Sequence, residues 1–387
     1  MIYKNLNVLD VINEKWLEHT DIEIKDGSIL NMGKLSGVYE DFSYENCYMI
    51  PGLIDCHTHI FMAGDADTIG SVQSMNTTDY VLLAIKNLER HIKSGVTTIR
   101  DVGGINHYDI ELKKHIKNGE LLSPDLYAAG KIVTMTGGHG YFIGREADGE
   151  TEVRKAVREQ LKAGADLIKV ISSGGVLTPG VDVNAYQFNI DELKAATEEA
   201  HKAGRKICTH CHSTQGIKNS VLAGIDSIEH ATLLDREGAQ MMAEAQTYMV
   251  PTLSAVDNIV KKGKDGGIPE FALKKGIDVY RKHLNSFRLA LEYNIPIAMG
   301  TDAGTPLNYH GDSPREILLM VENGMGVLEA IKTSTINGAK LVGIDDKAGS
   351  ISIGKNADLV IFKTNPEQQP ETLLTPLQVI KRGRHIL

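Results

Sequence analysis

The stretch Pro51-Gly52-Leu53-Ile54-Asp55-Cys56-His57-Thr58-His59 combines a short apolar run with polar residues at its end. This order is typical of a buried strand in a parallel sheet, whose carboxyl end faces the side where functional groups converge. Side chains alternate across a strand, so His57 and His59 point to the same side, as two ligands of one metal ion must. Because histidine pairs at this spacing also arise by chance, two partly exposed loop histidines are the competing interpretation.

Similar apolar runs alternate with longer amphipathic segments through the middle of the chain, which is the pattern of repeated βα units. The eight predicted strands are Leu53–Ile60, Thr97–Val102, Leu126–Val133, Leu167–Ile171, Lys206–His212, Ser227–Leu233, Tyr248–Leu253 and Ile297–Gly300. The predicted helices include Thr78–Lys93, Thr151–Ala163, Ile190–Ala203, Gln215–Ala223, Asp235–Ala245 and Glu270–Glu292. We therefore predict an α/β chain that forms a (β/α)8, TIM-like barrel.

The two ends of the chain differ from the middle, because they contain short alternating runs separated by turns. Asp26-Gly27 is a hairpin signal, and Gly354-Lys355 resembles a turn before a strand. We expect residues 1–49 and 349–387 to meet in one small, discontinuous β-sandwich that flanks the barrel of residues 50–348.

The composition is that of a globular protein, and the charge favours a small-molecule substrate over a larger anionic partner. Of 387 residues, 42% are hydrophobic, and the formal net charge of −9 argues against a nucleic-acid or anionic-membrane partner. Charges and Asn interrupt every apolar run in residues 1–18, so we predict no signal peptide, no membrane-spanning helix there and a cytoplasmic location. A homo-oligomer is expected. Cys208 and Cys211 form a C-x-x-C, but their strand-like setting favours buried thiols over a redox pair.

Further candidate metal ligands lie at the ends of other predicted strands. His210 closes the fifth strand, His230 the sixth and Asp302 the eighth. In a closed barrel these ends converge on one face, within reach of the histidines of the first strand. Four imidazoles and a carboxylate suit Zn, and they also suit Mn, Fe, Co or Ni.

Lys169 is a lysine inside the apolar run Leu167–Ile171, where charged side chains are unusual. One interpretation is a barrel lysine paired with a carboxylate. The other is a buried, neutral amine that takes up carbon dioxide and forms a carbamate bridging two cations. Spacing in the sequence does not decide between them.

Two more histidines are candidates for contact with a substrate. His139 lies in the glycine-rich loop Thr136–Gly140 after the third strand, where glycines let the backbone approach a ligand closely. His212 shares a strand face with His210. The competing interpretation for each is a histidine that only packs against its neighbours.

The opening stretch resembles the first-strand motif of the amidohydrolase superfamily, and Gly300-Thr301-Asp302-Ala303-Gly304 resembles its eighth-strand motif. Within the superfamily the chain is most similar to prolidase-like and carboxypeptidase-like metal-dependent hydrolases, which lie near the imidazolonepropionases. The resemblance covers nearly the whole chain and is also carried by Thr136–Gly140, Ile168–Val170, Ser173–Val176, Ile228–His230, Pro251–Leu253 and Ile353–Leu359.

The resemblance implies a site with two divalent metals. His57, His59 and Asp302 would hold one metal, His210 and His230 the other, and an N6-carboxylated Lys169 and a hydroxide would bridge them. It further implies that the bridging hydroxide attacks the amide bond of a dipeptide or N-acyl amino acid, with Asp302 as the catalytic residue that transfers the proton. An imidazolonepropionase-like site with one metal would instead leave Lys169 unmodified.

Two other functions stay open. The runner-up is a cyclic-amide or lactam hydrolase, or a deaminase, acting on a heterocycle. Deaminases of the superfamily usually carry an acidic residue on or after the fifth strand, where this sequence reads His210-Cys211-His212-Ser213-Thr214-Gln215. A barrel that only binds partners would be expected to lose ligands, whereas all six candidate positions are present here.

Overall fold

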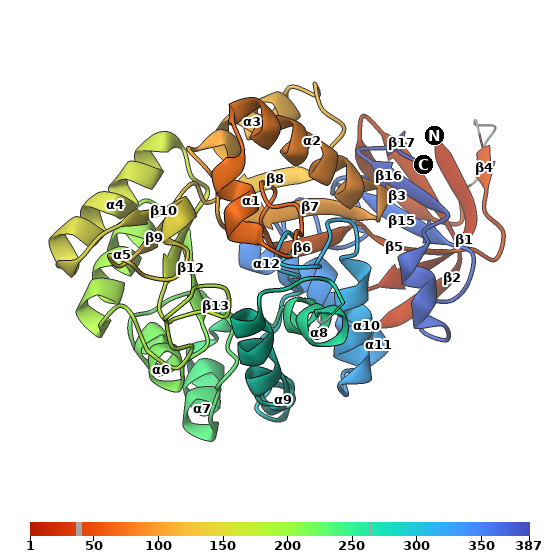
Figure 1. Cartoon of the computed structure of the whole chain (residues 1–387). Helices are drawn as coiled ribbons and strands as arrows, with labels where there is room; N and C mark the ends of the chain where they lie inside the picture. The colour runs from red at the N-terminus through yellow and green to blue at the C-terminus, as the bar shows by residue number, and fades with distance from the viewer. Residues whose placement is uncertain (36–40, 264) are drawn as a thin grey trace.

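The structure is a computed structural model that describes residues 1–35, 41–263 and 265–387. Residues 36–40 of the predicted N-terminal segment and residue 264 of the predicted barrel lie outside the described residues. Parallel strands and helices make up the middle of the chain, and strands from both ends form a sheet beside them (Figure 1). The predicted α/β class is confirmed.

The middle strands form two parallel sheets. Their bounds are β6 Leu53–Thr58, β7 Val96–Asp101, β8 Asp125–Ala128, β9 Ile132–Thr134, β10 Gly144–Glu146, β11 Leu167–Ile171, β12 Lys206–Cys211, β13 Ser227–His230 and β14 Tyr248–Val250. One sheet has the order β6-β7-β8 and the other β10-β9-β11-β12-β13-β14. At one edge Asp166 N donates to Ala128 O (2.8 Å). At the other edge Cys56 N donates to Met299 O (2.9 Å) and Ala298 N to Met249 O (3.1 Å).

Two of the predicted strands are wrong as continuous strands. Leu126–Val133 is divided into β8 and β9, because Gly130 between them takes a φ of +69° and turns the chain. Ile297–Gly300 is not assigned as a strand, although Ile297 forms an isolated bridge with Met249 of β14. Its Met299 N–H donates to Thr333 O (3.1 Å) rather than to a neighbouring strand, which interrupts the ladder.

Helices surround the parallel strands (Figure 1). Their bounds are α1 Thr68–Ser74, α2 Thr77–Lys93, α3 Tyr108–Lys117, α4 Gly149–Ala163, α5 Ile190–Lys202, α6 Thr214–Leu222, α7 Arg236–Ala245, α8 Leu253–Lys262, α9 Glu270–Glu292, α10 Pro314–Glu322, α11 Val327–Lys332 and α12 Gly338–Val342. Shorter turns are the 3₁₀-helices η1 Tyr141–Ile143 and η3 Pro370–Leu374 and the π-helical η2 Thr333–Asn337. Asn76 and Asn189 begin α2 and α5 with capping boxes. None of the described helices is both long and apolar enough to cross a membrane.

The two chain ends meet in a single sheet. Its strands are β1 Ile2–Asp10, β2 Lys15–Lys25, β3 Ser28–Gly33, β4 Asp41–Ser43, β5 Tyr48–Pro51, β15 Leu359–Phe362, β16 Gln378–Lys381 and β17 Arg384–His385. The order is β17-β16-β15-β5-β1-β2-β3, with β4 also pairing with β1, and the two termini lie close together (Figure 1). Asp26 and Gly27 take positive φ values of 52° and 78° and form the predicted hairpin turn between β2 and β3.

Close packing joins this sheet to the parallel strands. Gly52 lies between β5 and β6, and a Cβ atom there would lie 2.2 Å from Thr97 Oγ1, so only glycine fits. Lys381 on β16 donates to Thr97 O (2.9 Å), Asp125 Oδ2 (2.7 Å) and Asp358 Oδ2 (2.9 Å). These contacts join the sheet of the chain ends to β7 and β8 of the parallel core. The thiols of Cys208 and Cys211 are free and buried.

Candidate active site

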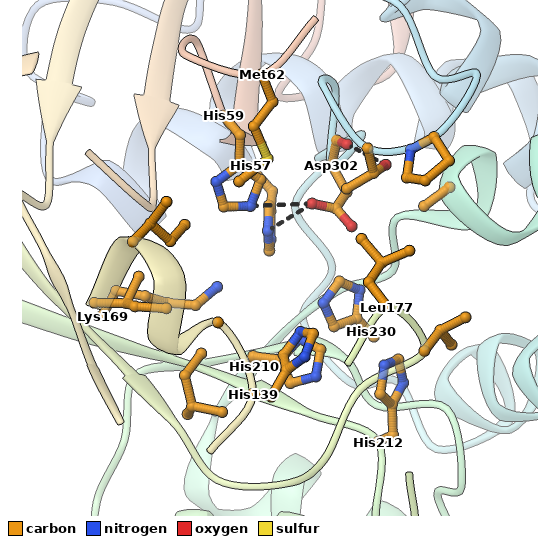
Figure 2. Close-up of a pocket in the computed structure, with 18 of the residues that line it drawn as sticks. His57, His59, Met62, His139, Lys169, Leu177, His210, His212, His230 and Asp302 are labelled. Atoms are coloured by element: carbon orange, nitrogen blue, oxygen red, sulfur yellow. Dashed lines mark hydrogen bonds and ion pairs between the residues drawn. The ribbon is translucent and has the colours of Figure 1, made fainter. Parts of the chain in front are cut away.

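A cavity at the carboxyl ends of the parallel strands gathers all the predicted site residues (Figure 2). Its ionisable lining consists of His57, His59, His139, Lys169, His210, His212, His230 and Asp302. Its apolar lining includes Met62, Ile132, Phe142, Ile143, Ile171, Val176, Leu177, Ala255, Val256, Ile259 and Pro306. Convergent polar groups beside an apolar wall are the usual composition of a small-molecule site.

The first cluster of candidate ligands consists of His57, His59 and Asp302, whose ligand atoms all lie within 4.8 Å of one another. Asp302 Oδ1 lies 3.3 Å from His57 Nε2 and 3.2 Å from His59 Nε2. Burial alone would raise the pKa of Asp302, but the two facing imidazoles hold it below its ordinary value. The group is therefore an ionised carboxylate at neutral pH, the form that binds a metal.

The second cluster consists of His210, His212 and His230, whose ligand atoms also lie within 4.8 Å of one another. Nδ1 of His230 is hydrogen-bonded to Thr252 Oγ1 (2.6 Å) and Nδ1 of His212 to Thr232 Oγ1 (2.7 Å), which leaves Nε2 of both rings for a ligand. Burial and the neighbouring imidazoles hold the pKa of His210 and His230 well below the ordinary value. His212, which the sequence predicts as a substrate contact, thus lies beside two predicted metal ligands, His210 and His230.

Lys169 on β11 is only 2% exposed and lines the same cavity. Figure 2 shows its amine directed toward the space between the two clusters. Within the part of the chain that the structure describes, no carboxylate pairs with this amine and no hydrogen bond reaches it. The first interpretation from the sequence, a lysine paired with a carboxylate, therefore does not describe Lys169 in the structure.

His139 lies in the loop after β9 and points into the cavity (Figure 2). Its ring centroid is 4.3 Å from that of His210, and its Nδ1 is hydrogen-bonded to Thr178 Oγ1 (2.7 Å). Burial lowers the pKa of His139 to about 4, so the ring is neutral near pH 7. The loop holds it as a hydrogen-bonding group beside the second cluster.

A buried ion pair supports the first cluster, and neither of its members was predicted as a site residue. Glu229 on β13 accepts from His57 Nδ1 (2.6 Å), Ser227 Oγ (2.7 Å) and an Arg100 Nη2–H (2.9 Å). Burial alone would raise the pKa of Glu229, but Arg100 and the bond from His57 lower it to about 2. A charged residue inside a predicted buried strand was the available signal, as it was for Lys169.

Replacing Glu229 with alanine is expected to lower the free energy of unfolding by roughly 3–5 kcal/mol, because the buried Arg100 would lose its counter-ion. Urea denaturation of the metal-free protein measures this loss. Glu237→Ala is the matched control, since its side chain is 73% exposed on α7. Equal stability of the two variants would show that the Arg100–Glu229 pair does not support the site.

Several site residues have an unusual backbone conformation. Asp302, His230 and Thr252 take positive φ values of 61°, 71° and 52°. Such values are uncommon outside glycine, and they persist where the surrounding structure holds them. His230 is the last residue of β13, and Thr252 follows β14 by two residues, so the parallel strands end near these positions.

Clustered histidines and an aspartate at the ends of parallel strands are characteristic of metal-dependent hydrolases. Residues 48–387 match the profile of the amidohydrolase family. The chain therefore belongs to this family, and it is a hydrolase that acts on C–N bonds, as the sequence predicts.

Known proteins similar to this chain agree with the family. Ochratoxinase from Aspergillus niger is 30% identical over 361 residues, which cover 86% of this chain and 73% of that protein. A crystal structure of a Xaa-Pro dipeptidase with bound methionine in the active site is 34% identical, has a TM-score of 0.93 and covers 99% of this chain and 98% of that one. Imidazolonepropionase from Caldanaerobacter subterraneus subsp. tengcongensis is 25% identical and covers 89% of this chain and 84% of that protein.

Proposed function

We propose that the protein is a metal-dependent amidohydrolase that cleaves the amide bond of a dipeptide or an N-acyl amino acid. The observation that carries this proposal is the cavity, in which six residues able to hold metals meet beside an apolar wall. The names of two relatives, a Xaa-Pro dipeptidase and an ochratoxinase, support the substrate class.

The scaffold for this activity is a (β/α)8 barrel of residues 50–348 with a flanking β-sandwich of residues 1–49 and 349–387. Hydrogen bonds between the edges of the two parallel sheets support the barrel. Two different parts of β1 pair with two different strands: Ile2–Lys4 pairs with β4, and Asn7 and Val8 pair with β5. This change of partner along one strand supports a sheet that folds over on itself as a sandwich. Tyr3, Val8, Ile22, Leu359 and Ile380 belong to one apolar core drawn from both chain ends.

The residues present fit two divalent metals, Zn by preference and Mn, Fe, Co or Ni by the same donor set. His57, His59 and Asp302 would hold one, and His210 and His230 the other, with an N6-carboxylated Lys169 between them. The amine of Lys169 is buried between the two clusters and forms no ion pair or hydrogen bond with the described residues, and this placement supports the carbamate. When bound, the metals supply an activated water molecule and polarise the substrate carbonyl.

Asp302 moves the proton in this mechanism. Its Oδ1 faces His57 and His59, while no hydrogen bond from the described residues reaches its Oδ2. Oδ2 accepts the proton of the attacking water and returns it to the nitrogen of the leaving amine.

His139 and His212 bind the substrate, and the apolar wall selects its side chains. Both histidines line the cavity, and each has its Nδ1 fixed by a threonine hydroxyl, so that Nε2 is left for the ligand. Leu177, Val256 and Ile259 lie on the wall and carry no charge that could pair with a charged substrate side chain. We expect apolar side chains next to the scissile amide.

The variant His212→Asn separates a substrate contact from a metal ligand. If His212 contacts the substrate, the substitution is expected to leave the metal content unchanged. It should raise KM about tenfold, because one hydrogen bond to the substrate is lost. Metal analysis and steady-state kinetics on the same preparation measure both quantities. Loss of one metal equivalent would instead identify His212 as a metal ligand.

The experiment that tests the function is a screen of dipeptides, N-acyl amino acids and lactams, with metal analysis of the same sample. We expect close to two divalent metals per chain, hydrolysis of linear amides with apolar side chains, and loss of activity on chelation that added metal restores. Hydrolysis of lactams alone would favour the cyclic-amide alternative, which the similarity to imidazolonepropionases keeps open. No bound metal after metal-supplemented expression would contradict the mechanism. The cytoplasmic location and the homo-oligomer stay predictions.

A further inference from the structure

The loop of residues 172–189 connects β11 to α5 and forms part of the cavity wall. Its two ends are joined, since Gly174 N donates to Ala185 O (2.9 Å) and Gln187 N to Ser172 O (2.8 Å). Between these bonds the loop contributes Val176 and Leu177 to the cavity lining, and Figure 2 shows Leu177 among the side chains around the site. The position of this loop therefore sets the shape of the substrate site.

The same loop contacts His139 in two places. Thr178 Oγ1 is hydrogen-bonded to Nδ1 of His139 (2.7 Å). Gly175 lies so close to the ring that a Cβ atom there would be 2.3 Å from Cε1 of His139. A displacement of the loop would thus release the hydrogen bond and open space behind the imidazole.

Lys275 holds this loop from α9, which is about a hundred residues further along the chain. Its ammonium donates to three main-chain carbonyls of the loop, those of Gly175 (3.3 Å), Thr178 (2.9 Å) and Val181 (2.7 Å). A lysine ammonium has three N–H groups, so the three carbonyl oxygens of the loop can use all of its hydrogen-bond donors. No carboxylate in the described part of the chain forms an ion pair with Lys275.

Apolar contacts accompany the hydrogen bonds. Val176, Leu177 and Val183 of the loop belong to a cluster with Val256 and Ile259 of α8 and with residues of α9. This cluster is separate from the main core and lies against the cavity. Removing the ammonium would therefore loosen the loop without unfolding the protein.

We propose that Lys275 is a positioning residue that fastens the loop of residues 172–189 and thereby sets the places of His139 and Leu177 in the substrate site. The proposal rests on the proposed function, in which His139 and the apolar wall contact the substrate. Lys275 itself does not line the cavity, so it acts on the substrate only through the loop.

The test replaces Lys275 with methionine, which keeps the length of the side chain and removes the three donors. Lys274→Met is the matched control, because Lys274 is the exposed neighbour on the same helix. We expect faster amide hydrogen exchange in residues 174–185 of Lys275→Met, an increase of about tenfold in KM, a change within about twofold in kcat, and unchanged metal content. Lys275→Arg should restore part of both properties, since it keeps the charge but its planar fork cannot reach all three carbonyls.

Hydrogen exchange is measured without substrate, so it tests the fastening of the loop whatever the enzyme hydrolyses. Parent-like exchange in Lys275→Met would overturn the proposal, and so would faster exchange with an unchanged KM. Loss of kcat together with metal, or exchange that rises equally across the whole chain, would also overturn it, because either result indicates general destabilisation. If no amide is hydrolysed by the parent protein, the proposed function fails and the exchange data alone show whether Lys275 holds the loop.

Discussion

Replacing Asp302 with asparagine is expected to lower kcat by about 10⁴-fold while leaving the protein folded. The amide keeps the size of the side chain and its contacts with the two imidazoles of the first cluster, but it cannot accept a proton from the attacking water. The turnover rate on a hydrolysed amide measures the effect, and circular dichroism and thermal unfolding verify the fold.

Asp346→Asn provides the control for this variant. Asp346 is 69% exposed at its side chain and pairs with the neighbouring Lys347, so its replacement should leave kcat unchanged. Metal content must be measured for both variants, because asparagine is a weaker ligand than aspartate. Full activity of Asp302→Asn with its metals bound would remove Asp302 from the proton path.

Replacing Lys169 with alanine is expected to remove one metal per chain and to lower kcat/KM by roughly a thousandfold. The carbamate that would bridge the two clusters is lost, and His210 and His230 alone make a weak site. Metal analysis after gel filtration and steady-state kinetics measure the two effects. The surface variant Lys162→Ala should change neither, since Lys162 is exposed on α4.

Chemical rescue distinguishes a carbamate from an unmodified lysine. A short carboxylic acid such as propionate fits the space that alanine leaves and supplies the missing carboxylate, so added propionate should restore metal binding and part of the activity. Mass analysis of the parent protein adds a second measurement, because a carbamate increases the mass of the residue by carbon dioxide. Full metal content in Lys169→Ala without any acid would contradict the bridging role and favour the mononuclear alternative.

The elements with a strong periodic pattern were predicted well. Glu270–Glu292 is a helix over the predicted residues, and Leu167–Ile171 is a strand over the predicted residues. The failures come from single backbone groups whose partners lie far away in sequence. Gly130 divides the predicted third strand, and the hydrogen bond from Met299 to Thr333 interrupts the predicted eighth.

Among the site residues too, local sequence pattern predicted the candidate ligands but not the contacts between distant segments. Alternation along one strand was enough to place His57 and His59 on one side, and strand ends were enough to select His210, His230 and Asp302. The carboxylate that orients His57 was missed, because Glu229 lies 172 residues away and its contact depends on how two strands pack. The sequence placed His212 on the same strand face as His210, but only the structure shows that its ligand atom lies within 4.8 Å of those of His210 and His230, because a strand face does not give distances.

Local pattern along the chain therefore determined the α/β class, the order of strands and helices, and the type of residue at the strand ends, because backbone periodicity and burial act over a few neighbouring residues. The tertiary structure decided which groups meet. It left the amine of Lys169 without an ion pair or hydrogen bond among the described residues, paired Glu229 with Arg100, and brought Lys275 to a loop near residue 178. Contacts of this kind depend on the packing of segments that are distant in sequence, and no local pattern carries that information.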